Sequence, residues 1–295
     1  MDTASHPISD RLVAHYAQDG WARFLGVELN RDSDNAPAQL RLAYDPRLLN
    51  ADGGVVHGGI LASLLHDAAR LEIAAALAPG HALDALRPLD GQIVYLRPAR
   101  ETDVIASARL LRLGRTLAFA TAEVRDAQGN LVAQGQWVFA LQATEGTMEP
   151  LPDAKTLAED WDGQADTGRM GALLEANMQK RLPGLALSQM GAGRCVIEVA
   201  HTPHFLDATG AVAAGPQLLA CDNVGVFAGF GLSARITRMS TAALKLSFIA
   251  PPRDEPLVVV GRSLGKSGPL IANQGRIYGR DSGRLYAFGT ITLAT

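Results

Sequence analysis

The chain reads GGVVHGGILASLLHD from Gly53 to Asp67, so a histidine and a pair of glycines stand directly before a run of apolar residues. From Ile60 to about Leu77 the apolar residues recur with helical spacing, which predicts a helix that begins near the glycines. The first N–H groups of a helix lack partners within it and lie at the positive end of its dipole. Glycines at that point let a ligand oxygen approach the bare backbone. The stretch is therefore typical either of a capped core helix or of a site that holds an oxyanion.

The composition of the 295 residues argues against several classes of protein. Hydrophobic residues make up 47% of the chain, and the net charge of −3 comes without a basic block that would favour nucleic acid. The two cysteines, Cys195 and Cys221, lie in separate apolar stretches and are interpreted as reduced core thiols. The N-terminus has no signal-peptide pattern, and charged residues interrupt the most apolar helix. We expect a cytoplasmic protein that binds neither nucleic acid nor membrane.

The chain is predicted to consist of two similar halves. Residues 144–166 are acidic, contain prolines and show no sustained periodicity, which is typical of a linker. On either side of it, glycines and prolines recur at a nearly constant separation, so that Gly58 falls opposite Gly215. We therefore expect one unit at residues 1–143 and a second, diverged unit at residues 167–295.

Each half has the same predicted order of elements. An amphipathic helix and a strand come first, then the central helix after the glycines, then four strands with alternating apolar residues. The initial helices are expected at 10–24 and 170–181, with strands ending near Ala43 and Ala200. The later strands are expected at 91–97, 103–113, 117–125 and 131–141, and at 242–249, 257–263, 270–278 and 285–293. One central helix against about five antiparallel strands is an α+β unit.

The motifs at these places resemble those of a known family. VHGG at 56–59 enters the central helix, and VYLRPA at 94–99 precedes an apolar strand at 118–124. The second half carries the related segments AGPQL at 214–218 and SFIAPP at 247–252. Together they resemble the hotdog-fold acyl-CoA thioesterases, particularly the phenylacetyl-CoA-thioesterase-like branch, with two copies in tandem. The resemblance implies an α+β pseudo-dimer in which each unit wraps an antiparallel sheet around a long central helix.

The resemblance also implies a reaction and a set of site residues. In the family, a carboxylate acts as general base or nucleophile on a thioester while helix N–H groups stabilise the oxyanion. Each site combines the helix start of one unit with residues of its partner, aided by an asparagine and a hydroxyl. These roles transfer to Asn50, His57, Gly58, Gly59 and Thr241. The second site has Pro88, Ala214 and Pro216 at the matching positions. The resemblance thus implies one working site per chain, which hydrolyses acyl-CoA.

The position of the acid departs from the family's pattern. The usual place, nine residues after the motif histidine, holds His66 in the first half and Asn223 in the second. Asp67 lies one residue later and Asp222 one residue earlier. We expect Asp222 to serve the intact site. Asp67 is the weaker candidate, expected to be a partly exposed helix acid or a remnant of the silent site, and a site without a carboxylate is the alternative.

The expected ligand is acyl-CoA or an acyl-carrier protein, with no cofactor and no metal. His201, His204 and Asp207 are interpreted as a surface loop rather than a metal site. Five arginines at predicted strand ends could pair with the phosphates of coenzyme A, namely Arg97, Arg100, Arg112, Arg115 and Arg253. We further expect a homo-oligomer of double-hotdog chains.

Other functions compete with thioester hydrolysis. A non-catalytic acyl-thioester binder would share the fold but leave its ligand uncleaved. Asp52 and His57 have the spacing found in hotdog enoyl-CoA hydratases, although the residues around them differ from that family's loop. Ser263 in GRSLG matches a nucleophile elbow, but KSGP follows where a helix is required.

Overall fold

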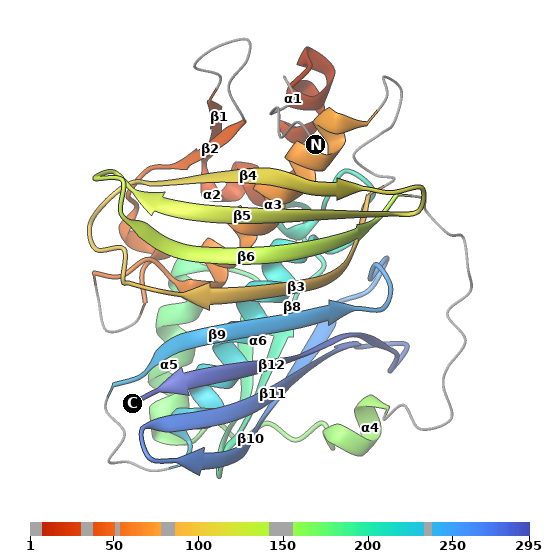
Figure 1. The fold of residues 1–295 in the computed structure, drawn as a ribbon. Helices are drawn as coiled ribbons and strands as arrows, with labels where there is room; N and C mark the ends of the chain where they lie inside the picture. The colour runs from red at the N-terminus through yellow and green to blue at the C-terminus, as the bar shows by residue number, and fades with distance from the viewer. Residues whose placement is uncertain (1–7, 31–37, 51–53, 78–85, 142–155, 233–237) are drawn as a thin grey trace.

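One continuous antiparallel sheet forms the frame of the molecule (Figure 1). The computed structural model describes residues 8–30, 38–50, 54–77, 86–141, 156–232 and 238–295. The first-half strands are β1 (Val27–Asn30), β2 (Gln39–Leu42), β3 (Arg87–Tyr95), β4 (Val104–Leu113), β5 (Leu117–Asp126) and β6 (Leu131–Ala140). The second-half strands are β7 (Leu185–Gly191), β8 (Arg194–Val199), β9 (Ser240–Phe248), β10 (Leu257–Ser267), β11 (Leu270–Gly279) and β12 (Leu285–Ala294). Their order is β1-β2-β4-β5-β6-β3-β9-β12-β11-β10-β8-β7, so the halves join where β3 pairs with β9.

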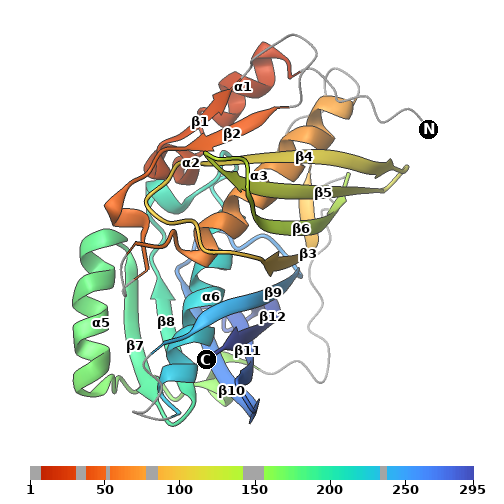
Figure 2. The ribbon, with the colours of Figure 1, turned by 60° about the vertical axis from the view of Figure 1, so that its left-hand side comes forward.

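Two long helices lie against the same side of this sheet, which curves around them (Figure 2). α3 (Gly58–Ala76) packs on first-half strands and α6 (Ala214–Phe230) packs on second-half strands. The two helices also contact each other closely, because a Cβ built on Gly59 would lie only 2.4 Å from Cα of Leu219. No side chain fits in that space, so Gly59 is required for the packing of α3 on α6.

Most of the predicted elements are confirmed. Both central helices and all eight later strands are present, with ends within a few residues of those expected. Each half has a long helix wrapped by antiparallel strands, which is the expected hotdog arrangement in two copies. Ser263 lies within β10, so the strand-to-helix turn of a nucleophile elbow is absent at this serine.

The segments before the central helices differ from the prediction. Residues 10–24 form two helices, α1 (Asp10–Tyr16) and α2 (Gly20–Leu25), rather than one. The break occurs because Oδ1 of Asp19 accepts a hydrogen bond from the N–H of Ala22 at 3.0 Å and so caps a new helix. Two strands also replace the single strand expected next, since β1 pairs with β2 and β7 pairs with β8. The corresponding helix of the second half is α5 (Gly168–Arg181), close to the expected bounds.

The predicted linker lies partly outside the described residues, which resume at 156. There α4 (Leu157–Asp160) lies on the face of the sheet opposite α6, where it packs near Tyr278. Asp160 is 2% exposed and accepts hydrogen bonds from Tyr278 and Arg276. These contacts attach the end of the linker to the second half. The division of the chain at 144–166 stays a prediction.

Cys195 and Cys221 are free and buried, as the sequence indicates. Burial raises the pKa of both thiols above the ordinary value, so both remain protonated near neutral pH. Among the described residues, no helix combines the length and the apolar character needed to cross a bilayer.

Candidate active site

His57, Gly58, Asp222 and Thr241 form what we call the open site, built around the first turn of α3. His57 is the N-cap residue of this helix, and its Nδ1 accepts a hydrogen bond from the N–H of Gly59 at 3.1 Å. Its Nε2 lies 2.7 Å from Oδ1 of Asn223 on α6. An imidazole that accepts at Nδ1 carries its proton on Nε2, which then donates to the asparagine. The ring is therefore held between the two halves.

The carboxylate of Asp222 reaches the same helix start from the second half. Its Oδ1 accepts a hydrogen bond from Oγ1 of Thr241 at 2.7 Å, and its Oδ2 accepts one from the N–H of Gly59 at 3.1 Å. Oδ2 also lies 3.3 Å from Nδ1 of His57. Asp222 is only 2% exposed, and the positive end of the α3 dipole stabilises its charge. A buried carboxylate is thus fixed in one orientation at the start of the other half's helix.

Gly58 lies directly against this carboxylate. A Cβ built on Gly58 would be 3.0 Å from Oδ2 of Asp222 and 3.4 Å from the ring of Tyr95. Within the part of the chain that the structure describes, the N–H of Gly58 has no hydrogen-bond acceptor. The hydroxyl of Tyr95 donates to the carbonyl oxygen of Gly58 at 3.0 Å, and burial raises its pKa well above the ordinary value. Chemically, the arrangement offers a proton acceptor beside a backbone donor at a helix start.

A large cavity opens at this site. Its volume is about 1150 Å³, and Gly58, Asp222 and Thr241 form part of its wall. Much of the rest is apolar and comes from α5 and α6. Five arginines also line it, namely Arg47, Arg97, Arg100, Arg181 and Arg238. Of the arginines proposed from the sequence, Arg97 and Arg100 are therefore at the cavity, whereas Arg112, Arg115 and Arg253 do not line it.

Asn50 lies at the edge of the cavity. Its backbone oxygen accepts a hydrogen bond from Nη1 of Arg181 at 3.1 Å, and its backbone N–H donates to the carbonyl of Val55 at 2.8 Å. The side-chain amide of Asn50 makes no hydrogen bond to another described residue. Its backbone therefore shapes the loop before α3, and a role for the amide would require a bound ligand or water.

The matching place in the other half is closed, and we call the group of Trp21, Gly215 and Asp67 the closed site. Trp21 on α2 is 1% exposed and covers the start of α6, since a Cβ built on Gly215 would lie 2.1 Å from its Nε1. Pro88 lines the small space left there, which has a volume of about 60 Å³. The two pseudo-symmetric places thus differ in volume by more than an order of magnitude.

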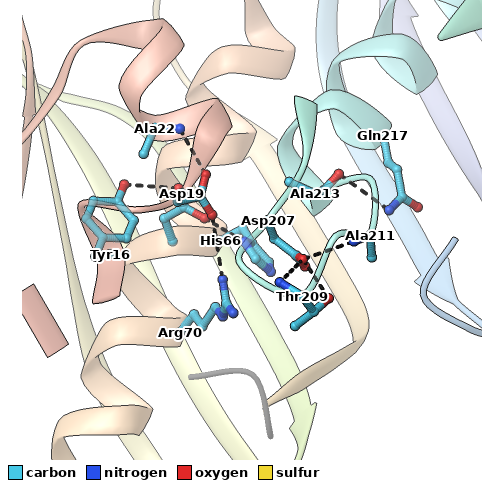
Figure 3. Close-up of polar contacts among 11 residues, drawn as sticks. Tyr16, Asp19, Ala22, His66, Arg70, Asp207, Thr209, Ala211, Ala213 and Gln217 are labelled. Carbon is cyan, nitrogen blue, oxygen red and sulfur yellow. Dashed lines mark hydrogen bonds and ion pairs between the residues drawn. The ribbon is translucent and has the colours of Figure 1, made fainter. Parts of the chain in front are cut away.

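Tyr16, Asp19, His66 and Arg70 belong to a polar network near this small space (Figure 3). Asp67 is also part of this network. Its Oδ2 accepts a hydrogen bond from the hydroxyl of Tyr16 at 3.1 Å, and its Oδ1 lies 2.8 Å from Nδ1 of His66. Asp67 is 7% exposed, so the expectation of a partly exposed helix acid was wrong, and the residue lies at the second, closed helix start. From Gly58 it is separated by about 13 Å along α3, which places it away from the open site.

Asp19 in the same network is expected to weaken folding at neutral pH. Burial and, second, the charge of Asp67 raise its pKa from 3.8 to about 6. A carboxyl with a raised pKa binds its proton more tightly in the folded than in the unfolded state. Protonation of Asp19 therefore stabilises the fold fully below its ordinary pKa of 3.8, and this stabilisation is lost as the pH rises through about 6. Asp19→Asn keeps a good N-cap and removes the charge. We expect the variant to be more stable by about 1–3 kcal/mol at pH 7–8, with the gain disappearing near pH 4.

Urea unfolding of both proteins between pH 4 and pH 8 measures this difference. A variant that is less stable than the native protein at pH 8 would show that the ion pair with Arg70, 3.9 Å away, outweighs the cost of burying the charge.

Sequence reasoning assigned no role to two residues that contact the open site. Asn223 stands at the family's usual acid position, so its register with His57 was a signal for a contact with the motif. Tyr95 is part of the motif at 94–99, but nothing in the sequence indicates that its hydroxyl reaches the carbonyl of Gly58. Asp52, the acid of the hydratase-like spacing, lies outside the described residues.

Two central helices wrapped by one sheet, with an acid of one half against the helix start of the other, define a double-hotdog protein. A sequence model of the thioesterase superfamily matches residues 53–133. A Halobacterium salinarum protein described as a candidate esterase is 36% identical over 137 residues, which cover 43% of this chain and 89% of that protein. The medium/long-chain acyl-CoA thioesterase YigI of Salmonella typhimurium is 32% identical over 115 residues, covering 35% and 74%. The chain belongs to the thioesterase superfamily, whose reaction is thioester hydrolysis.

Solved structures extend the likeness over the whole chain. A hotdog-fold protein of unknown function from Alicyclobacillus acidocaldarius has a TM-score of 0.63 at 17% identity and covers 94% of this chain and 97% of its own. The tesB protein of Mycobacterium avium subsp. paratuberculosis has a TM-score of 0.64 at 14% identity and covers 93% and 98%. At these identities the likeness concerns the fold alone, and it confirms the double hotdog.

Proposed function

We propose that the protein hydrolyses acyl-CoA thioesters at one composite site per chain. The start of α3 comes from the first half, and Asp222 and Thr241 come from the second. The observation that supports this most directly is the carboxylate of Asp222 beside Gly58, where a backbone N–H at a helix start has no acceptor among the described residues. Thioester hydrolysis needs both a base and an oxyanion donor at one carbonyl.

The reaction would proceed with the thioester oxygen accepting a hydrogen bond from the N–H of Gly58. Asp222 takes a proton from the attacking water, or attacks the carbonyl carbon itself and is then released by water. The tetrahedral oxyanion forms at the helix start, and the thiolate of coenzyme A departs. Thr241 and the N–H of Gly59 hold the carboxylate, while Asn223 holds the ring of His57 in place.

The charges around the cavity favour coenzyme A as the carrier of the acyl group. Arg47, Arg97, Arg100 and Arg181 come from segments next to the start of α3, and guanidinium groups pair well with phosphates. The relative YigI is named for medium/long-chain acyl-CoA. An acyl-carrier protein presents the same thioester on a phosphate-bearing arm and is the second candidate carrier.

The proposal also includes the organisation of the chain. We infer that residues 1–143 and 167–295 are two units joined by the linker at 144–166, and that such double-hotdog chains assemble into homo-oligomers. Light scattering of the purified chain tests the assembly. A mass of one chain at all concentrations would contradict it without affecting the single-site proposal.

Release of free thiol from a panel of acyl-CoA and acyl-carrier-protein thioesters tests the function. We expect turnover of acyl-CoA at rates of at least about 1 s⁻¹, within the usual range for enzymes. Tight binding of an acyl-CoA that stays uncleaved would indicate a binding protein instead. Addition of water to an enoyl-CoA without thiol release would indicate a hydratase.

A further inference from the structure

We propose that Arg181, the last residue of α5, is a positioning residue that holds the loop before α3 in the shape that hydrolysis requires. The side chain belongs to the second half of the chain, whereas the loop belongs to the first. This inference rests on the proposed function. It adds to the open site a residue that acts through the backbone of the other half rather than on the thioester.

The loop before α3 contains two short paired segments. The N–H of Asn50 donates a hydrogen bond to the carbonyl oxygen of Val55 at 2.8 Å. The N–H of His57 donates one to the carbonyl oxygen of Leu48 at 3.0 Å. This pairing brings His57 to its place as the N-cap residue of α3, directly before Gly58. A displacement of the segment 48–50 would therefore move the backbone donor of the open site.

Arg181 holds the segment 48–50 from α5. Its Nη1 donates hydrogen bonds to the carbonyl oxygens of Leu49 at 2.9 Å and of Asn50 at 3.1 Å, two acceptors that take no part in the pairing of the segments. Hydrogen bonds from a charged donor are stronger than those between neutral groups. Met178 and Leu182, on either side of Arg181, are 7% and 6% exposed, so the end of α5 is anchored in the core. The guanidinium group is thus a fixed support for the loop.

The closed half holds its matching loop through a different contact. The loop before α6 has the same pattern, in which the N–H of the N-cap residue Ala213 bonds to the oxygen of Phe205 at 2.9 Å. The next carbonyl, that of Leu206, matches that of Leu49 and accepts a hydrogen bond from the backbone N–H of Gly20 at 3.0 Å. Each loop is therefore tied to a helix of the other half, α2 in one case and α5 in the other. In the open half a side chain makes the contact, so one substitution removes it without changing the backbone.

A phosphate of coenzyme A is the competing partner for Arg181, because the same guanidinium lines the cavity. The two roles predict different kinetics. A positioning residue affects kcat for every thioester, whereas a phosphate contact affects the KM of substrates that carry phosphate. An acyl-N-acetylcysteamine keeps the thioester and lacks every phosphate, so it distinguishes the two roles.

Kinetics of Arg181→Met with both kinds of thioester test the inference. Methionine keeps the apolar part of the side chain and removes the charge. We expect kcat for acyl-CoA and kcat/KM for the matching acyl-N-acetylcysteamine to fall alike, by about 10–100-fold, because small displacements of reacting groups cost factors of this size. Arg181→Lys should recover most of the loss, since a single nitrogen makes both hydrogen bonds. Arg23→Met removes an exposed arginine of α2 that lines neither cavity and should keep the native rates.

Hydrogen exchange of the loop amides separates this inference from the proposed function, because it requires no turnover. The paired amides of Asn50 and His57 should exchange faster in Arg181→Met by about tenfold or more, as expected for the loss of a charged hydrogen bond. Their exchange should return toward the native rate in Arg181→Lys and stay unchanged in Arg23→Met. Arg181→Gln replaces Arg181→Met if the methionine variant does not fold.

The outcomes distinguish the two proposals. Native exchange of the loop amides in a folded Arg181→Met variant would overturn the positioning role. A change confined to the KM of acyl-CoA, with acyl-N-acetylcysteamine unaffected, would overturn it in favour of a phosphate contact. Faster exchange of the loop amides in a protein that cleaves no thioester would support the contact between Arg181 and the loop and overturn the hydrolase.

Discussion

Replacing Asp222 by asparagine is expected to lower kcat for acyl-CoA hydrolysis by about 10²–10⁴-fold, the range that a positioned general base contributes. Asparagine keeps the shape of the side chain and can still accept a hydrogen bond from Thr241, which now lies 2.7 Å from Oδ1. It cannot take a proton from water or attack a carbonyl carbon. Because asparagine matches aspartate in size and shape and keeps the bond to Thr241, the fold should remain intact. Steady-state kinetics with detection of free thiol measures the loss.

Asp67→Asn is the matched control for this change. Asp67 is the corresponding acid near the closed site, bonded to Tyr16 and next to His66, and its hydrogen bonds to described residues do not reach Gly58. Its substitution should reduce turnover by no more than a few-fold. If the two variants have similar melting temperatures, their turnover numbers can be compared directly. Similar losses of turnover in both would contradict a single working site per chain.

The sequence predicts the fold well because its strongest signals are local. The helical spacing after Ile60 and the alternation in the later strands both report burial on one face, and the structure has these elements near the expected bounds. The repeated glycines and prolines indicate two copies of one unit. The break between α1 and α2 was missed because a single capping contact from Asp19 outweighs the continuous helical pattern around it.

The site was less accessible to sequence reasoning. His57 and the glycines indicate a helix start in the sequence. The residue that contacts His57 is Asn223 on α6, which is more than 160 positions away in the chain. A shift of one residue turns a helical side chain by about 100°, so the choice between Asp222 and Asn223 could not rest on spacing alone. Both reach the open site, Asp222 at Gly59 and Asn223 at His57.

The closing of the second site also depends on a contact that spacing does not reveal. Ala214 and Pro216 show in the sequence that the second motif has changed, yet Trp21 lies in a different element and fills the space by packing. Loss of the motif and filling of the cavity are consistent with each other, because a helix start that holds no ligand is stabilised by burial. The closed site therefore adds to the core, and the open site remains available for binding.

Gly58→Ala keeps the backbone N–H but hinders its use, so it should lower turnover by about 10²–10³-fold, comparable to the typical cost of losing one oxyanion donor. The added Cβ would lie 3.0 Å from Oδ2 of Asp222, so the carboxylate must shift by a few tenths of an ångström. The methyl group would also crowd the approach of a thioester oxygen to the N–H. Alanine is favourable in a helix, so the melting temperature should be maintained or rise while kcat falls.

Gly215 is a poor control for this change, because a Cβ there would meet Trp21 at 2.1 Å and disturb the core. Gly265→Ala is a better one, since a Cβ added there would have no described atom within 4 Å and the residue does not line the cavity. It should retain the turnover of the native protein. A folded Gly58→Ala variant with full turnover would mean that the helix start does not bind the thioester oxygen. A variant that still binds acyl-CoA but no longer turns it over would show that the alanine acts on Asp222 and the oxyanion, and not on substrate affinity.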